Sequence, residues 1–493
     1  MAKENINRNV KDRRGSVAIK ESEYFFYILL IAFVVLMAPH LIRFASGNTT
    51  LIGAQPYLHA RIAEGMDWAN IADTRFVDDL ILGGRLIQYN PYHYLLAVSG
   101  HLFTVTTASK MLPFVFGLLT ITFFYFTLKS LGIKSLNRFI LSVLLVLSPP
   151  FIYLFSVSTP SSMSISLTML GLYLYLSDKK YALGASLFCF FIVSFFSFFN
   201  LLLIILVILV ISLIMGTKRE KMLFFVLSIL VIYLFKPVAF YNSFDYQAVS
   251  LRDIVSDLGA QIGFGVFNLI LAFIGLFYSW KSKEKLYPLY FAVALLFAAT
   301  FFIGREANAY SNFFLILFAG IGLLRIKELE WRFLQLRDIT FMIIACGLLF
   351  SSISYTIRLS NAEPSEDVFK SLEFLEKNSD EGALVFTHYS RGYWVETIAR
   401  RPVLADSLFY TIPDFNKRQL YSQDLFRSNS LDETRVVLGR YNISYIWIDK
   451  SMKEGLVWHE EKEGLLFLLR NEETFKKVYS SNETEIFKVQ GLN

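Results

Sequence analysis

Hydrophobic residues in this chain gather into blocks of roughly 16–20 residues, separated by short polar loops, and the pattern ends near Arg358. A block of this length is long enough to cross a bilayer as an α-helix. The blocks predict about eleven spans, at 24–41, 108–129, 139–157, 160–176, 181–198, 201–215, 222–240, 263–280, 286–304, 310–324 and 339–357. The pattern therefore predicts an α-helical polytopic membrane protein whose direct environment is the lipid bilayer.

The composition agrees with a membrane protein. Of the 493 residues, 55% are hydrophobic and 18% are charged, whereas a soluble protein usually carries about 25% charged residues. The net charge of +6 does not indicate a nucleic-acid partner, because the basic residues lie in the short loops between apolar blocks. In those loops Lys and Arg determine the orientation of the spans.

The distribution of Lys and Arg predicts which ends face the cytoplasm. Basic residues fill the N-terminal tail and every second loop, whereas the short loops of the opposite side hold Arg252 and Arg305. By the positive-inside rule the tail, 1–23, is cytoplasmic. The first block reads as an uncleaved span. With an odd number of spans, the C-terminal part is extracytoplasmic and the protein is a multi-pass protein of the cell membrane.

Three regions follow: the tail, a transmembrane domain at 24–357 with a large first outer loop at 44–107, and a soluble domain at 358–493. In the loop, Pro56 begins a short amphipathic helix with Leu58, Ile62 and Met66 on one stripe. The soluble domain alternates helices and strands, which predicts an α/β fold. Its strands are expected at 383–387, 402–405, 443–448, 465–469, 477–479 and 485–489, and two of its helices at 392–399 and 432–439.

Carboxylates of the first loop are the first candidates for chemistry. An enzyme that transfers a sugar or phosphate needs a base for the acceptor or a ligand for a cation, and Asp73, Asp78 and Asp79 provide such groups. The alternative is a solvated acidic turn.

Cationic and histidine side chains are also predicted on the outer side. Arg61, Arg85 and Arg305 suit phosphate binding, with structural ion pairs, such as Arg61 with Glu64, as the alternative. All six histidines fall on the outer side, but none has the close spacing of a zinc site, which favours structural roles.

Two stretches of the sequence resemble those of a known family. The first loop reads Gln55-Pro56-Tyr57-Leu58-His59-Ala60-Arg61, followed by Asp78-Asp79, Gly83-Gly84-Arg85 and Asn90-Pro91-Tyr92-His93. The soluble domain reads Gly392-Tyr393-Trp394 and, further on, Arg401 through Asp406. In these runs and in its layout, the chain resembles the GT-C superfamily of membrane glycosyltransferases, particularly archaeal relatives of the oligosaccharyltransferase catalytic subunit.

The resemblance implies a glycosyltransferase that takes a sugar from a polyprenyl-phosphate donor at the outer membrane face. Its acceptor would be a glycan or a lipid, because the acceptor-peptide motif of oligosaccharyltransferases is replaced by His388-Tyr389-Ser390-Arg391. The implied catalytic residues are Asp78 and Asp79, with Asp73 and Glu64. Arg61, Arg85 and Arg305 would bind the donor phosphate, and Gln55, Tyr57, His59 and His93 would line the pocket. A divalent cation is possible as cofactor.

Two departures from the family keep other functions open. Gln55 is neutral where the family has an aspartate, and the stretch after the third span, 158–163, lacks the family's acidic pair. A non-catalytic protein that binds lipid-linked glycans or assists assembly would fit these losses. A lipid-linked-glycan flippase is the third hypothesis, although it would need a continuous polar path that the apolar spans do not provide.

Overall fold

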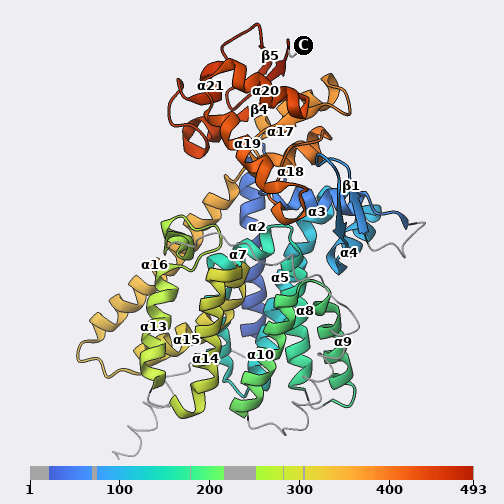
Figure 1. Cartoon of the computed structure of the whole chain (residues 1–493). Coiled ribbons are helices and arrows are strands. Elements are labelled where there is room, and N and C mark those ends of the chain that lie inside the picture. Colours follow the sequence, from blue (N-terminus) through green and yellow to red (C-terminus); the bar gives the residue numbers. More distant parts are fainter. Residues whose placement is uncertain are drawn as a thin grey trace, which may run out of the picture.

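A helical bundle carries a globular domain at one end in the computed structural model (Figure 1). The structure describes residues 21–68, 75–177, 179–215, 251–280, 283–303 and 306–491. The first loop lies between the bundle and the domain, beside α18 (Gly392–Trp394) of the domain. The loop and the domain therefore share one end of the bundle.

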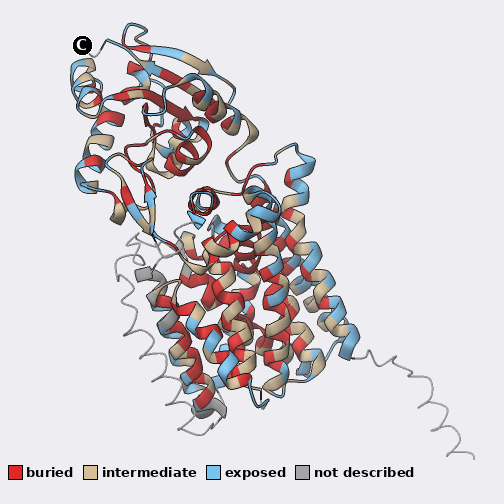
Figure 2. Ribbon diagram, turned by 90° about the vertical axis from the view of Figure 1, so that its right-hand side faces the viewer, coloured by how far each residue is buried: buried red, intermediate tan, exposed pale blue. Residues whose placement is uncertain are grey.

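The bundle consists of the apolar helices that the blocks predict. They are α2 (Glu21–Ala45), α5 (Val105–Ser130), α6 (Ser135–Val146), α7 (Pro149–Ser156), α8 (Pro160–Tyr175), α9 (Ala182–Ser194), α10 (Phe198–Met215), α13 (Val266–Ser279), α14 (Lys283–Ile303), α15 (Glu306–Glu328) and α16 (Leu334–Ser360). The short helix α12 (Leu251–Ile254) precedes α13 and belongs to no predicted span. The third predicted span, at 139–157, is divided into α6 and α7, and the seventh, at 222–240, lies outside the described residues. Each of the other predicted spans overlaps mainly with one helix. Buried positions face the middle of the bundle (Figure 2).

Not every apolar helix is long enough to cross a membrane by itself. Among the described helices, four have the length and composition of a span, or five if the bent pair α6 and α7 is one span. The two halves of that pair meet at 66°. The bend falls at Pro149 and Pro150, because proline lacks the N–H that would continue the helix.

Helices α13 and α15 touch through their backbones. A Cβ atom at Gly275 would lie 1.8 Å from the carbonyl oxygen of Phe318, and one at Gly322 would lie 2.1 Å from that of Leu271. Small residues allow this close approach, which is a common way for helices to pack inside a membrane.

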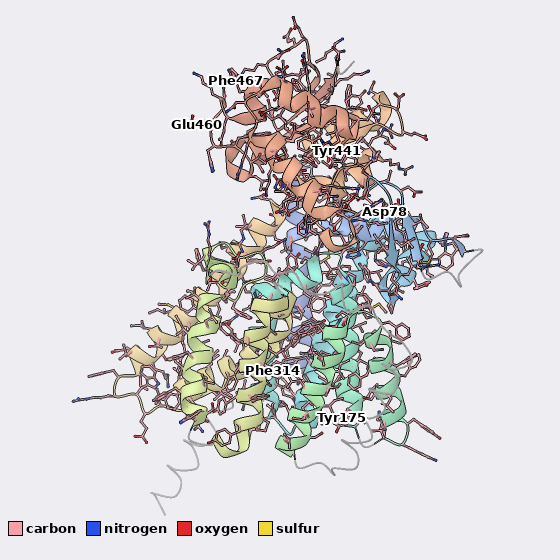
Figure 3. All side chains as sticks on the ribbon, viewed as in Figure 1. Asp78, Tyr175, Phe314, Tyr441, Glu460 and Phe467 are labelled. Atoms are coloured by element: carbon pink, nitrogen blue, oxygen red, sulfur yellow. The ribbon has the colours of Figure 1, made fainter. Side chains whose placement is uncertain are left out.

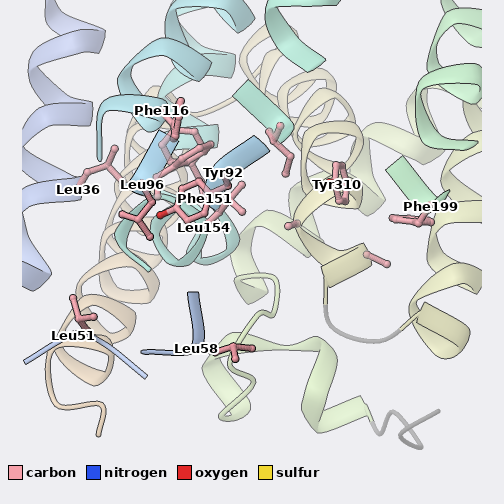
Figure 4. Close-up of a cluster of buried hydrophobic side chains, with 14 of the residues drawn as sticks. Leu36, Leu51, Leu58, Tyr92, Leu96, Phe116, Phe151, Leu154, Phe199 and Tyr310 are labelled. Atoms are coloured by element: carbon pink, nitrogen blue, oxygen red, sulfur yellow. The ribbon is translucent and has the colours of Figure 1, made fainter. Parts of the chain in front are cut away.

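The first loop folds against the bundle. It contains α3 (Gln55–Glu64), the hairpin strands β1 (Arg75–Asp78) and β2 (Arg85–Gln88), and α4 (Pro91–Leu102). The predicted stripe is buried, since Leu58 and Ile62 of α3 and Met66, two residues beyond its end, are all at most 7% exposed. Tyr92 and Leu96 of α4 belong to the same hydrophobic cluster as Phe116, Phe151 and Leu154 of the bundle (Figure 4).

The soluble domain has the predicted α/β character. Its four-stranded sheet has the order β3-β4-β6-β5, with β3 and β4 parallel and the other neighbours antiparallel. The elements are α17 (Glu366–Asn378), β3 (Leu384–Phe386), α18 (Gly392–Trp394), the π-helix Val395–Ala399, α19 (Phe415–Arg427), α20 (Leu431–Tyr441), β4 (Ile443–Asp449), α21 (Gly464–Leu468), β5 (Phe475–Ser480) and β6 (Thr484–Val489). Trp394, Trp447 and Trp458 are fully buried in it.

Two predicted strands are wrong, and helix α19 was not predicted. The run at 465–469 forms α21, because five consecutive apolar residues fit a buried helix as well as a strand. The segment at 402–405 is not a strand, although Val403 forms single bridges with Val385 and with Ile81 of the first loop. The backbone of Val403 also exchanges hydrogen bonds with Leu80 and Leu82, so the loop and the domain are joined by main-chain contacts.

Arg43, near the end of α2, joins three parts of the chain. It is 2% exposed, and its guanidinium donates hydrogen bonds to the carbonyl oxygens of Thr50 at 3.3 Å, Ser360 at 2.9 Å, Ala362 at 2.6 Å and Pro364 at 2.6 Å. These acceptors belong to the first loop, the end of α16 and the start of the soluble domain. A planar cation with five donors can hold several segments at once, which Lys cannot do in the same way.

The backbone contact of α13 and α15 gives a first prediction. Gly275→Ala should lower the thermal stability of the purified protein in detergent by about 1–3 kcal/mol, because its methyl group would collide with backbone. Gly184→Ala is the matched control, since a Cβ atom there meets nothing within 4 Å. Equal melting temperatures for the two variants would contradict the close contact.

Candidate functional site

Five charged side chains meet where the first loop contacts the soluble domain. Figure 3 shows the position of one of them, Asp78. Arg61 binds both oxygens of Asp78, at 2.5 and 3.0 Å, and its Nη2 lies 2.5 Å from Oε2 of Glu396. Nε of Arg85 lies 2.8 Å from Asp78 Oδ2. Both terminal nitrogens of Arg85 bind the carboxylate of Asp406, with Nη1 2.9 Å from Oδ1. We call these five residues the interdomain charge cluster.

The local sequence explains how the cluster forms. Helix α3 carries Arg61, and the register of the hairpin places Asp78 directly opposite Arg85. The turn between the strands uses Gly83 and Gly84, whose φ values of +82° and +65° favour glycine.

The domain side of the cluster depends on a third glycine. A Cβ atom at Gly392 would lie 2.6 Å from the Cβ of Asp406, so α18 can approach this aspartate only without a side chain. The π-helix that follows α18 carries Glu396.

Burial determines the protonation of the cluster. Asp78, Glu396 and Asp406 are all 0% exposed. With three ionised carboxylates and two guanidinium groups the cluster would carry one net negative charge. Burial raises the pKa of Glu396 well above its usual value, and the nearby Asp406 adds to the rise, although Arg61 opposes it. A protonated Glu396 makes the cluster neutral, which is the state that a buried site favours.

The same contacts limit what Asp78 can do. Burial alone would raise its pKa, but hydrogen bonds and charge from Arg61 and Arg85 hold the pKa of Asp78 below its usual value. A carboxylate in this state accepts a proton poorly. The spacing of Arg61 and Glu64 predicts an ion pair between them. Arg61 instead pairs with Asp78 and Glu396. In this arrangement the cluster joins the loop to the domain.

The other predicted site residues are not part of the cluster. Asp79, Glu64 and Gln55 are exposed. The hydroxyl of the buried Tyr57 accepts the backbone N–H of Leu51 at 3.1 Å. Asp73 and Arg305 lie outside the described residues.

His59 and His93 form a pair between α3 and α4. Nδ1 of His59 lies 2.9 Å from Nε2 of His93, and Nδ1 of His93 accepts the backbone N–H of Asn90 at 3.2 Å. The Asn90 side chain caps α4 in return, accepting the N–H groups of Tyr92 and His93. Burial lowers the pKa of His59 to about 4 and the pKa of His93 well below its usual value. Both rings are therefore neutral at physiological pH.

Neutral polar side chains continue from the histidine pair into the bundle. The hydroxyl of Tyr92 lies 2.6 Å from Oγ of Ser158, and Nδ2 of Asn312 donates to Oγ of Ser148 at 2.7 Å. All four are buried. Ser148 and Asn312 do not stand out in the sequence, because a single neutral polar residue in an apolar span has no spacing that points to a partner. For the histidine pair a spacing signal exists, since Asn90 with His93 three residues later forms the capping box at the start of α4.

The described residues do not fit a divalent cation held by protein groups alone. No group of three or more His, Cys, Asp or Glu side chains is close enough together among them to hold a metal ion. Gln55 is neutral, and Asp78 is bound to two guanidinium groups.

Comparison with known proteins identifies the fold. No family model and no curated protein matches the chain. The solved structure of the oligosaccharyltransferase of Archaeoglobus fulgidus is 12% identical, with 94% of this chain and 74% of that chain covered and a TM-score of 0.65. ArnT of Cupriavidus metallidurans bound to undecaprenyl phosphate is 12% identical. The match covers 95% of this chain and 98% of ArnT, with a TM-score of 0.50.

A third structure extends the comparison. The arabinofuranosyltransferase AftD from mycobacteria is 13% identical with a TM-score of 0.55 and covers 94% of this chain. This chain covers 41% of AftD. The resemblance to GT-C membrane glycosyltransferases that the sequence indicates is thus confirmed at the level of the fold.

The protonation of the charge cluster gives a second prediction. At pH 7, Glu396→Gln should change stability by less than about 1 kcal/mol, because glutamine copies a protonated glutamate. Asp406→Asn should cost about 3–5 kcal/mol, because it leaves Arg85 with one buried partner fewer. Thermal unfolding of the full chain in detergent measures both. A loss of equal size in the two variants would show that Glu396 is ionised.

The same glutamate predicts a pH dependence. A folded-state pKa raised above the unfolded value means that the folded protein binds a proton that the unfolded chain does not. Stability should therefore fall as the pH rises through the folded-state pKa of Glu396. This slope should be absent in Glu396→Gln, and melting temperatures of both proteins from pH 5 to pH 10 would measure it. Parallel curves would count against the assignment.

Proposed function

We propose that this protein is a membrane glycosyltransferase that takes a sugar from a polyprenyl-phosphate donor and passes it to a glycan or lipid acceptor. The observation that carries the proposal is the extent of the fold match, since 94–95% of the chain aligns with three transferases. Two of the similar structures contain dolichol-phosphate or undecaprenyl phosphate. Because proteins of this fold bind a lipid phosphate, the fold match supports the same class of donor here.

The proposal includes the predicted topology of eleven spans, with the N-terminal tail in the cytoplasm and both the loop and the domain outside. The interdomain charge cluster supports one part of it, because residues that share a buried ion network must lie on the same side of a membrane. The reaction would then take place at the outer face.

The reaction needs a base and stabilisation of the leaving group. An acceptor hydroxyl attacks the anomeric carbon, its proton passes to a carboxylate, and the bond to the phosphate breaks with its electron pair on the phosphate oxygen. Asp79 and Glu64 are exposed on the loop, and with Asp73 they are the carboxylates that we propose for the base. Arg305 is the guanidinium that we propose for the leaving phosphate. Asp78, Arg61 and Arg85 would position the loop, and Gln55, Tyr57, His59 and His93 would line the pocket.

A non-catalytic protein that binds lipid-linked glycans is the second candidate. Two observations favour it: the neutral Gln55, and the engagement of Asp78 with Arg61 and Arg85. A divalent cation would depend on Asp73 together with substrate oxygens.

Transfer can be tested by mass spectrometry of lipid-linked glycans from a strain that lacks the protein, complemented with single variants. At least one of Asp73→Asn, Asp79→Asn and Glu64→Gln should reduce transfer by roughly 100-fold or more, the usual contribution of a general base. Glu460→Gln, an exposed carboxylate of the soluble domain, is the control. If deletion leaves the glycan profile unchanged, the non-catalytic alternative is favoured.

A second pair of variants separates positioning from catalysis at Asp78. Asp78→Asn and Asp406→Asn both remove one carboxylate from the charge cluster, so at equal amounts of folded protein they should reduce transfer to a similar degree. A loss in Asp78→Asn that exceeds the loss in Asp406→Asn by 100-fold would instead make Asp78 a catalytic residue.

A further inference from the structure

The histidine pair fixes the position of every ring proton. A backbone N–H can only donate, so Nδ1 of His93 must carry the lone pair that accepts from Asn90. A neutral His93 then carries its proton on Nε2 and donates it to Nδ1 of His59, 2.9 Å away. A neutral His59 must in turn carry its proton on Nε2. The backbone of Asn90 thus sets the tautomer of a ring two hydrogen bonds away.

The outer edge of His59 remains available. His59 is only partly buried. Within the described part of the chain its Nε2 has no hydrogen-bond partner, and that atom is not fully buried. Burial lowers the pKa of the ring to about 4, so the edge stays a neutral N–H donor between pH 5 and pH 9. A fixed donor cannot act as a base, which excludes His59 from taking the acceptor's proton.

Nearby groups favour an anionic oxygen as the partner of this donor. The ring of His59 lies against Tyr92, with 6.3 Å between the centroids, and Tyr92 is hydrogen-bonded to Ser158. Ser158 stands two residues before α8, a helix whose N-terminus has no side-chain cap. The first residue of the helix, Pro160, has no N–H, and the N–H of Ser162 donates to the carbonyl oxygen of Thr159. The positive end of the helix dipole is therefore what favours negative charge here. Arg61 and Arg85, the loop cations predicted for the phosphate, are engaged by carboxylates.

We propose that the Nε2–H group of His59 donates a hydrogen bond to a phosphate oxygen of the polyprenyl-phosphate carrier, with His93 and Asn90 holding it in the donor tautomer. The inference rests on the proposed function for the identity of the ligand. It makes His59 a binding residue for the leaving group, and His93 a positioning residue that acts through it.

The tautomer can be tested without any ligand. In the full-length protein labelled with ¹⁵N-histidine in lipid nanodiscs, His59 should show a protonated Nε2 and an unprotonated Nδ1 across pH 6 to 8. Its signal is identified as the one that is lost in His59→Gln. A protonated Nδ1, or a doubly protonated ring at pH 7, would overturn the inference.

The ligand can be tested with two amide variants. Glutamine places its N–H₂ near the position of Nε2, whereas asparagine reaches only the position of Nδ1. His59→Gln should therefore bind undecaprenyl phosphate within about threefold of the unaltered protein, and His59→Asn should bind it at least tenfold more weakly, about 1.4 kcal/mol. Binding is measured with the purified full-length protein in nanodiscs.

A neutral lipid separates recognition of phosphate from damage to the fold. Binding of undecaprenol, which has the same tail and no phosphate, should not differ between the two variants. If His59→Asn weakens the binding of both lipids equally, the histidine has a structural role and the inference fails. If neither variant changes phosphate binding, it also fails.

These measurements do not require sugar transfer. A donor tautomer with selective loss of undecaprenyl phosphate would uphold His59 as a phosphate ligand even in a protein without transferase activity. Conversely, active transfer with unchanged phosphate binding in His59→Asn would overturn the role of His59 alone.

Discussion

The contact between the first loop and the soluble domain depends on burying two guanidinium groups with three carboxyl groups. Isolated charges are very costly to remove from water, so each member of the cluster requires the others to remain in place. Arg61 and Glu396 are separated by 335 residues and Arg85 and Asp406 by 321. The cluster therefore holds two distant parts of the chain in one arrangement, and the main-chain bonds around Val403 and the carbonyl contacts of Arg43 reinforce it.

How far the sequence predicts this structure depends on the range of the interactions. The helical bundle, the buried stripe of Leu58, Ile62 and Met66, and most strands of the domain follow from local periodicity, and all are confirmed. The run at 465–469 has no periodicity that separates a strand from a helix, and there the prediction failed. Arg61, Asp78 and Arg85 stood out as charged residues of one loop, but the partnership of Glu396 and Asp406 depends on tertiary folding that no local pattern reveals.

Neutral polar groups have as large a part in the candidate site as charged ones. The backbone of Asn90 orients His93 and through it His59, while Tyr92 and Ser158 connect the loop to the bundle. Burial favours such groups, because a hydrogen-bonded neutral side chain is far less costly to bury than an ion. The charged residues that stand out in the sequence of the loop therefore join the loop to the domain, whereas the phosphate-binding group that we propose is a neutral histidine.

The sequence separation within the charge cluster has a consequence for biosynthesis. A chain made from its N-terminus contains Arg61, Asp78 and Arg85 long before Glu396 and Asp406 exist. Until then the loop's part of the cluster has one guanidinium more than it has carboxylates, and that cation must stay hydrated. Because pairing over such a distance has a high entropic cost, it follows the formation of local structure. The loop and the domain thus reach their final arrangement only near the end of synthesis, so incomplete chains do not hold an assembled site.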